Sequence, residues 1–117
     1  MALVYSSSKA ALDMVTKTSA LELGPKGIRV NSVNPGPVET RFTRARGWSQ
    51  EQSDAFYPIL ADRMLMKRVG TAEDIANLIS FVASDDAVNI TGSILLSDSG
   101  FLIAPPVMNP QNLSLKN

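Results

Sequence analysis

The sequence predicts an α/β fold built on a parallel sheet, with an element order typical of the second half of a doubly wound domain. Helical and strand patterns alternate along the chain: a helix, a strand, a less regular segment, a second helix and a second strand. Strands separated by helices indicate parallel pairing, because each connection has to cross back over the sheet. Two strands alone make a poor sheet, and parallel strands need helices on both faces.

The first helix and the first strand have clear boundaries. Residues 5–23 are rich in alanine and leucine, with apolar positions at helical spacing. Residues 24–27 read Gly-Pro-Lys-Gly and end this helix, because proline cannot continue a helix and glycine suits its end. Residues 28–34 alternate apolar and polar side chains, several of them β-branched, which predicts a strand that the Pro-Gly-Pro run at 35–37 terminates.

The middle of the chain is less regular. Residues 38–70 contain one helix signal, Ser49 followed three positions later by Gln52, which matches a capping box. We expect a short helix to begin there and Pro58 to interrupt it.

The last two elements again follow a clear pattern. A helix is predicted to open at Thr71 and to close near Ser84, with apolar residues at helical spacing between them. Residues 93–97 are apolar in their middle, which predicts a strand buried on both faces. The chain from Pro105 has no periodicity, so we expect one partial domain over residues 1–104 and a loose tail over 105–117.

Composition narrows the function classes. The chain has 117 residues, enough for one small domain, and it carries 11 basic and 11 acidic residues. This balance gives no reason to expect nucleic acid or a membrane as a partner. There is no cysteine and no histidine, so thiol catalysis, histidine bases and metal sites built from these ligands are excluded. We expect no metal. No targeting segment is evident, so we expect a cytoplasmic location.

Tyr5 and Lys9 are the strongest candidates for chemistry. In a helix, residues four apart leave the same face one turn apart, with Cβ atoms about 5–6 Å from each other. A neighbouring ammonium favours the phenolate form of a phenol, so such a pair suits general acid–base chemistry near neutral pH. Taken alone, the same spacing also fits two solvated helix residues.

Five blocks in order resemble the short-chain dehydrogenase/reductase family. They are similar to its tyrosine–lysine motif (residues 5–12), the strand and turn that reach the cofactor (28–36), the segment that contacts nicotinamide and pyrophosphate (37–40), the start of the following helix (68–76) and the lead into the last strand (90–92). The resemblance covers about residues 3–103. Within the family it is similar to L-xylulose (dicarbonyl) reductases, other carbonyl reductases and 3-oxoacyl carrier-protein reductases.

The resemblance implies a Rossmann-like fold, of which this chain would form the C-terminal half. It also implies an NAD(P)-dependent oxidoreductase that interconverts a small carbonyl and an alcohol by hydride transfer, as a homo-oligomer in its intact form. Tyr5 would donate a proton to the carbonyl oxygen in reduction and accept it in oxidation. Lys9 would favour the Tyr5 phenolate and hydrogen-bond the nicotinamide ribose, so both residues would also contact the cofactor.

The remaining cofactor contacts implied by the resemblance follow the first strand. Pro35 and Gly36 suit a strand end where the backbone passes close to a ligand, although an ordinary turn explains them too. Val38 would present backbone groups to the nicotinamide carboxamide. Thr40 would hydrogen-bond the carboxamide or the pyrophosphate, and a helix N-cap is the alternative role for its hydroxyl.

Two further groups of residues have weaker functional meaning. Residues 41–66 occupy the place of the family's substrate-binding lid, and their large apolar side chains either line a pocket or pack a core; these are Phe42, Trp48, Phe56, Tyr57, Met64 and Met66. Asp98 follows the last strand, where relatives carry an aspartate and then glycines. Here Ser99 stands in the place of the first glycine, and we expect a structural role for Asp98.

Several parts of the family's site have no counterpart in these 117 residues. They are the glycine-rich turn that holds the pyrophosphate, the catalytic serine, the relay asparagine and the residue that selects NAD or NADP. Residues 6–8 are serines, but they lie on the tyrosine's own helix and do not replace the catalytic one. We therefore expect the N-terminal nucleotide-binding half to be absent, with NADP slightly preferred over NAD as the lineage's cofactor.

The missing parts leave the chain's own activity open. We expect the chain by itself to bind cofactor weakly or not at all and to have little reductase activity. An incomplete gene model, a splice form and a degenerate copy all fit. The alternative function is a non-catalytic module that oligomerises with full-length reductases, and a chain that does not fold alone is a third possibility.

Overall fold

The structure, a computed structural model, describes residues 2–103, which form two compact units. The first unit combines the chain up to Pro35 with Ala72–Ser97, and the second combines Gly36–Thr71 with the chain from Asp98. The predicted tail over residues 105–117 lies outside the described residues.

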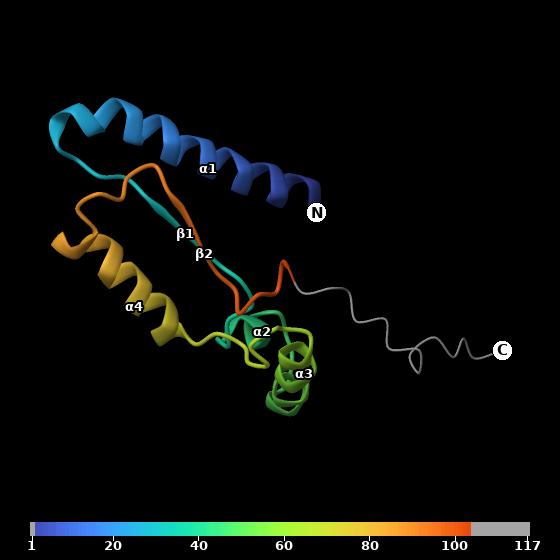
Figure 1. The fold of residues 1–117 in the computed structure, drawn as a ribbon. Coiled ribbons are helices and arrows are strands. Elements are labelled where there is room, and N and C mark those ends of the chain that lie inside the picture. Colours follow the sequence, from blue (N-terminus) through green and yellow to red (C-terminus); the bar gives the residue numbers. More distant parts are fainter. Residues whose placement is uncertain (1, 104–117) are drawn as a thin grey trace. The chain divides into compact units, whose positions relative to one another are not determined.

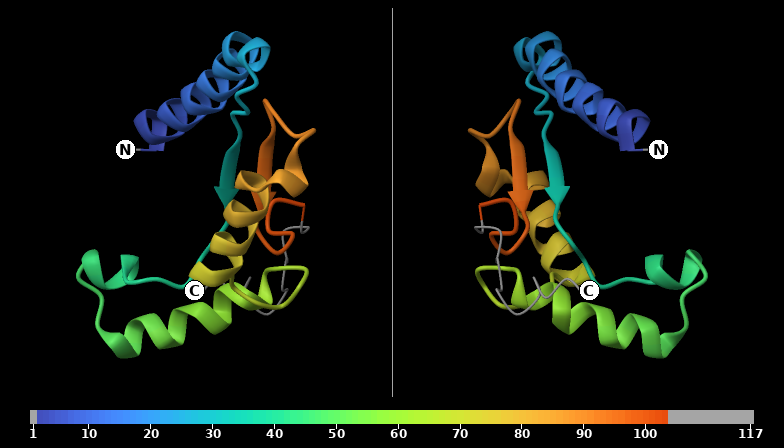
Figure 2. Two further views of the ribbon diagram at one scale, coloured as in Figure 1. Left: turned by 90° about the vertical axis from the view of Figure 1, so that its left-hand side faces the viewer. Right: turned by 90° about the vertical axis from the view of Figure 1, so that its right-hand side faces the viewer.

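The first unit is a pair of parallel strands between two helices. It contains α1 (Ala2–Leu23), the short 3-10 helix η1 (Gly24–Lys26), β1 (Ser32–Pro35), α4 (Ala72–Ala83), the 3-10 helix η2 (Asp85–Ala87) and β2 (Ile94–Ser97). β1 and β2 lie side by side and run in the same direction, with Ser32 opposite Ile94 and Pro35 opposite Ser97 (Figure 2). Within this unit, α1 and α4 lie on opposite sides of the strand pair (Figure 1). The predicted α/β class and the parallel pairing are confirmed.

The first strand is shorter than predicted, because side chains rather than a ladder hold its first half. Residues 28–31 were expected to be strand, but β1 begins at Ser32. Asn31 donates its side-chain N–H to the Ile90 carbonyl (2.8 Å) and accepts from the Ser93 amide (3.1 Å). Arg29 donates to carbonyls at and after the end of α4. The polar side chains of Arg29 and Asn31 therefore bond to the end of α4 and to the loop before β2, and residues 28–31 do not extend the strand.

The second unit contains two helices, α2 (Phe42–Ala45) and α3 (Gln50–Asp62). The predicted capping box is present: the Ser49 hydroxyl accepts from the Gln52 amide at 3.1 Å, and the Gln52 side chain accepts from the Ser49 amide at 2.9 Å. The expectation that Pro58 interrupts this helix is wrong, because α3 continues to Asp62. Pro58 removes the N–H that would bond to the Asp54 carbonyl, but both residues are exposed, so water can take that bond.

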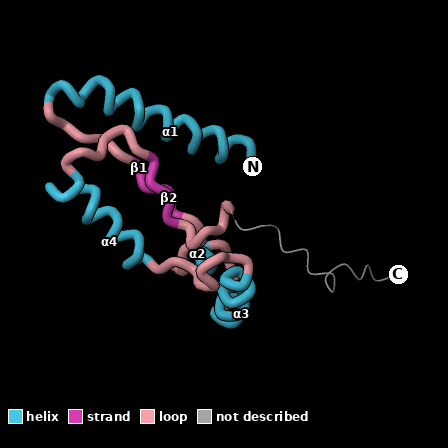
Figure 3. The backbone as a smooth tube through the Cα atoms, viewed as in Figure 1, coloured by secondary structure: helices cyan, strands magenta, loops and turns pink. Residues whose placement is uncertain are grey.

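The buried apolar side chains are few among residues 2–103. They are Ala20, Val82 and Ala87 in the first unit and Met64 in the second. Leu96, in the middle of β2, remains 50% exposed, so the prediction of a last strand buried on both faces is wrong at this position. A single neighbouring strand, with only short strands overall (Figure 3), is too small a sheet to cover it. None of the described helices combines the length and the apolar character that a membrane span requires.

Candidate active site

Tyr5 and Lys9 lie together at the N-terminal end of α1, as their spacing predicts. The Lys9 ammonium is 5.8 Å from the centroid of the Tyr5 ring, within the range of a cation–π contact. Tyr5 is 65% exposed, and the Ser8 hydroxyl donates to its carbonyl at 2.8 Å. The phenol is therefore accessible to a small molecule, with a positive charge one helical turn away.

Two contacts fix how α1 lies along the strands of the first unit. The Asn34 side chain donates to the Asp13 carboxylate at 3.2 Å. Seven residues further along the helix, the Ala20 Cβ is 3.5 Å from where a Cβ on Gly92 would lie, and the Gly92 amide donates to the Val30 carbonyl. From Ala20 to Asp13 the helix advances about 10 Å, and from Val30 to Asn34 the strand advances about 13 Å in the same direction. The helix therefore runs antiparallel to β1.

This direction takes the Tyr5–Lys9 pair beyond the end of β1. Lys9 is about 6 Å further along the helix axis than Asp13, whereas Pro35, the last residue of β1, is only about 3 Å beyond Asn34. Tyr5 lies a further turn out. Open α/β sheets bind their ligands beyond the carboxyl ends of their strands, so the pair projects into the region where a ligand is expected.

Pro35 is exposed at the end of β1, and Gly36 opens the second unit. A Cβ on Gly36 would clash with the Cβ of Asp98 and would lie 2.7 Å from its Cα. The Asp98 carboxylate in turn accepts from the amides of Gly100 and Leu102, both at 2.9 Å. The structure thus gives Gly36 a packing reason that the sequence did not reveal, and it gives Asp98 the structural role that was expected.

Val38 offers two backbone groups that the unit itself does not use. Val38 forms an isolated parallel bridge with Gly70, in which the Gly70 amide donates to the Pro37 carbonyl (3.2 Å) and the Glu39 amide donates to the Gly70 carbonyl (2.8 Å). In such a bridge, the N–H and C=O of the central residue point away from the partner. Neither group of Val38 has a hydrogen-bond partner within residues 2–103. An adjacent amide donor and carbonyl acceptor match a primary carboxamide.

Thr40 is held by Tyr57, which the sequence analysis assigned either to a pocket wall or to core packing. The Tyr57 hydroxyl accepts from the Thr40 amide at 3.3 Å and donates to the Thr40 carbonyl at 3.2 Å. The Thr40 hydroxyl accepts from the Phe42 amide at 3.3 Å, beside the start of α2. This is close to the helix-capping alternative, and it leaves the hydroxyl hydrogen available to a ligand. No sequence signal links residues 17 positions apart in a loop and a helix.

The large apolar residues of the predicted lid divide into packed and exposed ones. Trp48 and Phe56 make an edge-to-face contact with ring centroids 5.1 Å apart, and Phe56 lies 5.8 Å from Tyr57. Met64 is fully buried, whereas Phe42 and Met66 are 63% and 67% exposed. Packing therefore accounts for Met64 and the aromatic cluster, and Phe42 and Met66 remain available for contact with other molecules.

The sequence-predicted site residues thus fall into two groups. Tyr5, Lys9 and Pro35 belong to the first unit, whereas Gly36, Val38 and Thr40 belong to the second.

Comparison with known proteins identifies the lineage. A family model described as enoyl-(acyl carrier protein) reductase matches residues 1–102, which is most of the chain. The chain belongs to the short-chain dehydrogenase/reductase family. L-xylulose reductase from Caenorhabditis elegans is 46% identical over 98 residues, covering 84% of this chain and 38% of that protein. Carbonyl reductase [NADPH] 2 from Sus scrofa is 42% identical over 98 residues, with the same coverage.

A solved structure supports the short-chain dehydrogenase/reductase fold independently. The crystal structure of a short-chain dehydrogenase/reductase of unknown function from Caenorhabditis elegans, with cofactor, matches with a TM-score of 0.82 and 39% sequence identity. The match covers 89% of this chain and 40% of that one. The described residues therefore form part of a Rossmann-like fold, and the chain spans about two fifths of the length of the relatives it matches.

Proposed function

We propose that this chain carries the proton-transfer part of an NAD(P)-dependent oxidoreductase that interconverts a small carbonyl compound and an alcohol. The observation that carries the proposal is the Lys9 ammonium placed 5.8 Å from the Tyr5 ring, on a helix that runs past the carboxyl end of β1. In reduction, the Tyr5 hydroxyl donates its proton to the carbonyl oxygen, and Lys9 stabilises the phenolate that remains. In oxidation, the same phenolate accepts the alcohol proton.

The donor set of the second unit fits the nicotinamide end of the cofactor. The unpaired N–H and C=O of Val38 match the carboxamide, and the Thr40 hydroxyl retains a hydrogen for the carboxamide or a pyrophosphate oxygen. Gly36 directly follows Pro35, the last residue of β1. Because glycine has no side chain, the backbone at this point can pass close to the cofactor. The hydride comes from the nicotinamide when the cofactor is bound. We propose NADP rather than NAD, which the name of the Sus scrofa relative supports.

A binding experiment with the 117-residue chain tests this assignment. We expect weak binding to the chain alone, because the residues proposed above contact only the nicotinamide end. Titration with NADPH at millimolar concentration, followed by amide chemical shifts, should perturb Val38 and Thr40 and leave the Ser49–Gln52 cap unchanged. A Thr40→Val variant removes the proposed hydroxyl contact and should weaken the chemical-shift changes. Perturbation confined to other residues would refute the assignment.

Calorimetry and turnover measurements test how tightly the isolated chain binds the cofactor and whether it has reductase activity by itself. We expect no micromolar binding of NADPH or NADH and negligible oxidation of NADPH with small carbonyl compounds. Micromolar binding would overturn the proposed weakness of the chain by itself, and turnover that Tyr5→Phe abolishes would show that the chain is an active reductase alone.

A second candidate function is a non-catalytic module that oligomerises with full-length reductases. The observation that favours it is the apolar surface of α1, where five large side chains are each more than half exposed: Leu3, Val4, Met14, Val15 and Leu21. Exposed apolar patches of this kind mark interaction sites. Co-purification with a full-length homologue, without turnover by the chain itself, would favour this function over the first.

A further inference from the structure

We propose that Tyr57 is a positioning residue for the cofactor contact of Thr40, because its hydroxyl fixes the backbone on both sides of that residue. The inference rests on the proposed function, in which the Thr40 hydroxyl meets the carboxamide or the pyrophosphate. Tyr57 touches neither the cofactor nor the reacting atoms in this scheme, and it acts through Thr40.

The Tyr57 hydroxyl both accepts from and donates to the same residue. It accepts from the Thr40 amide at 3.3 Å and donates to the Thr40 carbonyl at 3.2 Å. The amide belongs to the peptide plane before Thr40 and the carbonyl to the plane after it, and only two soft torsions lie between these planes. One hydroxyl therefore restrains φ and ψ of Thr40 together, and these angles set the direction of the Thr40 side chain.

The segment around Thr40 depends on this side chain at one point. The Glu39 amide donates to the Gly70 carbonyl at 2.8 Å, and the Arg41 carbonyl accepts from an amide of α2 at 2.9 Å, so backbone bonds hold both neighbours. Within residues 2–103, the Thr40 backbone makes no hydrogen bond besides the two to Tyr57. The orientation of Thr40 is therefore controlled from α3.

The charged residues around Tyr57 cannot replace its hydroxyl. Four ionisable residues line the two cavities, of ≈ 330 and ≈ 260 Å³, that Tyr57 borders: Glu39, Arg41, Arg44 and Asp54. A guanidinium can donate to the Thr40 carbonyl but cannot accept from its amide, and an ionised carboxylate can accept but cannot donate. None of these side chains can therefore restore both bonds by itself.

The Tyr57 ring has a second contact that a conservative variant preserves. Its ring centroid is 5.8 Å from that of Phe56, which in turn packs edge-to-face on Trp48. Tyr57→Phe keeps the ring and this contact and removes only the hydroxyl. The variant therefore separates the bonds to Thr40 from the packing of α3.

Titration of the 117-residue chain with NADPH, followed by amide chemical shifts, tests the positioning role. The association constant comes from the curves of Val38 and residue 40. Tyr57→Phe should lower it about three- to tenfold, the contribution of one neutral hydrogen bond. Thr18→Val is the matched control: it removes an exposed hydroxyl that donates to the Met14 carbonyl within α1, and it should leave the constant unchanged.

A double-mutant cycle separates positioning from a general structural role. In a Thr40→Val background there is no hydroxyl left to position, so Tyr57→Phe should lower the association constant by less than about twofold. Thr40→Ser keeps the hydroxyl and should retain the full effect of Tyr57→Phe. An equal loss in the parent and in the Thr40→Val background would show that Tyr57 supports the unit as a whole, and it would overturn the proposal.

The same titration distinguishes this inference from the proposed function. If NADPH shifts Val38 and Thr40 in the parent but Tyr57→Phe leaves the association constant unchanged, only the positioning role fails. If NADPH shifts neither residue in the parent, the cofactor assignment fails and the positioning role fails with it.

Circular dichroism checks that each variant keeps its helices. If Tyr57→Phe does not fold, the parent still decides, through the ring-carbon resonance of 13C-labelled Tyr57 assigned with a Tyr5→Phe variant. Because the Tyr57 hydroxyl is bonded to Thr40, this resonance should follow the same NADPH titration curve as the Thr40 amide. A Tyr57 resonance that does not move while Thr40 does would overturn the proposal.

Discussion

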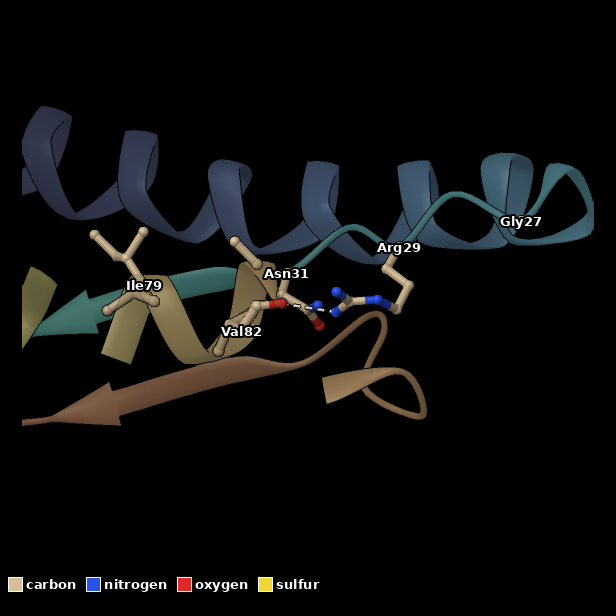
Figure 4. A pocket seen from close by; sticks show the side chains of 7 residues that line it. Gly27, Arg29, Asn31, Ile79 and Val82 are labelled. Carbon is tan, nitrogen blue, oxygen red and sulfur yellow. Dashed lines mark hydrogen bonds between the residues drawn. The ribbon is translucent and has the colours of Figure 1, made fainter. Parts of the chain in front are cut away.

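Arg29 is expected to be the residue whose loss costs the first unit most stability. Its guanidinium donates to the carbonyls of Val82 (2.7 Å), Ser84 (2.9 Å) and Ile90 (3.2 Å), at the end of α4 and in the loop before β2. Figure 4 shows the side chain reaching from the β1 segment to the Val82 carbonyl, beside a cavity of ≈ 610 Å³. The last carbonyls of a helix have no partner within it, and a positive charge there also complements the helix dipole.

The size of the loss follows from these three bonds. A hydrogen bond from a charged donor contributes about 1.5–3 kcal/mol, but Arg29 is only half-buried and its three bonds are not additive. Arg29→Ala should therefore lower the free energy of unfolding by about 3 kcal/mol. Arg29→Lys keeps the charge but replaces the planar fork by a single ammonium, and should recover about 1 kcal/mol of that loss.

Urea unfolding followed by circular dichroism measures both variants. The matched control is Arg41→Ala, because the Arg41 guanidinium makes no hydrogen bond within residues 2–103, and it should change stability by less than about 0.5 kcal/mol. A loss below about 1 kcal/mol for Arg29→Ala would refute the reasoning, as would an Arg29→Lys variant as stable as the parent.

Two further predictions concern the contact between Gly36 and Asp98 and the residue that follows Asp98. Gly36→Ala should destabilise the chain by about 2 kcal/mol in the same assay, because its Cβ would meet the Asp98 backbone, which cannot rotate away; a neutral effect would contradict this packing. Ser99 has a φ of +54°, in the left-handed region, so Ser99→Gly should stabilise the chain by about 0.5–1 kcal/mol. Ser97→Gly, within β2, is the matched control and should destabilise it, and a loss of stability in both variants would count against the strain at Ser99.

Much of the local structure was predictable because its causes are local. The apolar periodicity gave the helices of the first unit, and the Ser49–Gln52 spacing predicted the start of α3 and its two capping hydrogen bonds. The spacing of Tyr5 and Lys9 likewise predicted that they share one end of α1. In each case the interaction spans only one helical turn, so the sequence contains all of it.

The predictions that were wrong depend on interactions that are not local in the sequence. The first strand is shorter than predicted because Arg29 and Asn31 bond to groups more than 50 residues away. Pro58 does not end α3, since its exposure rather than its identity decides whether the lost bond matters. Leu96 is half exposed because burial depends on which elements cover a strand, and alternation or apolarity within the strand cannot report that.

The sequence by itself determined the family and the alternation of helices and strands, and it indicated Tyr5 and Lys9 as candidates for proton transfer. It could do so because motif spacing and periodicity are properties of the chain. Only the tertiary structure decided that Asp98 packs against Gly36, that Tyr57 holds Thr40, and that Asn34 engages Asp13. These contacts join residues 17 to 62 positions apart, and each depends on packing within its own unit, which no local pattern encodes.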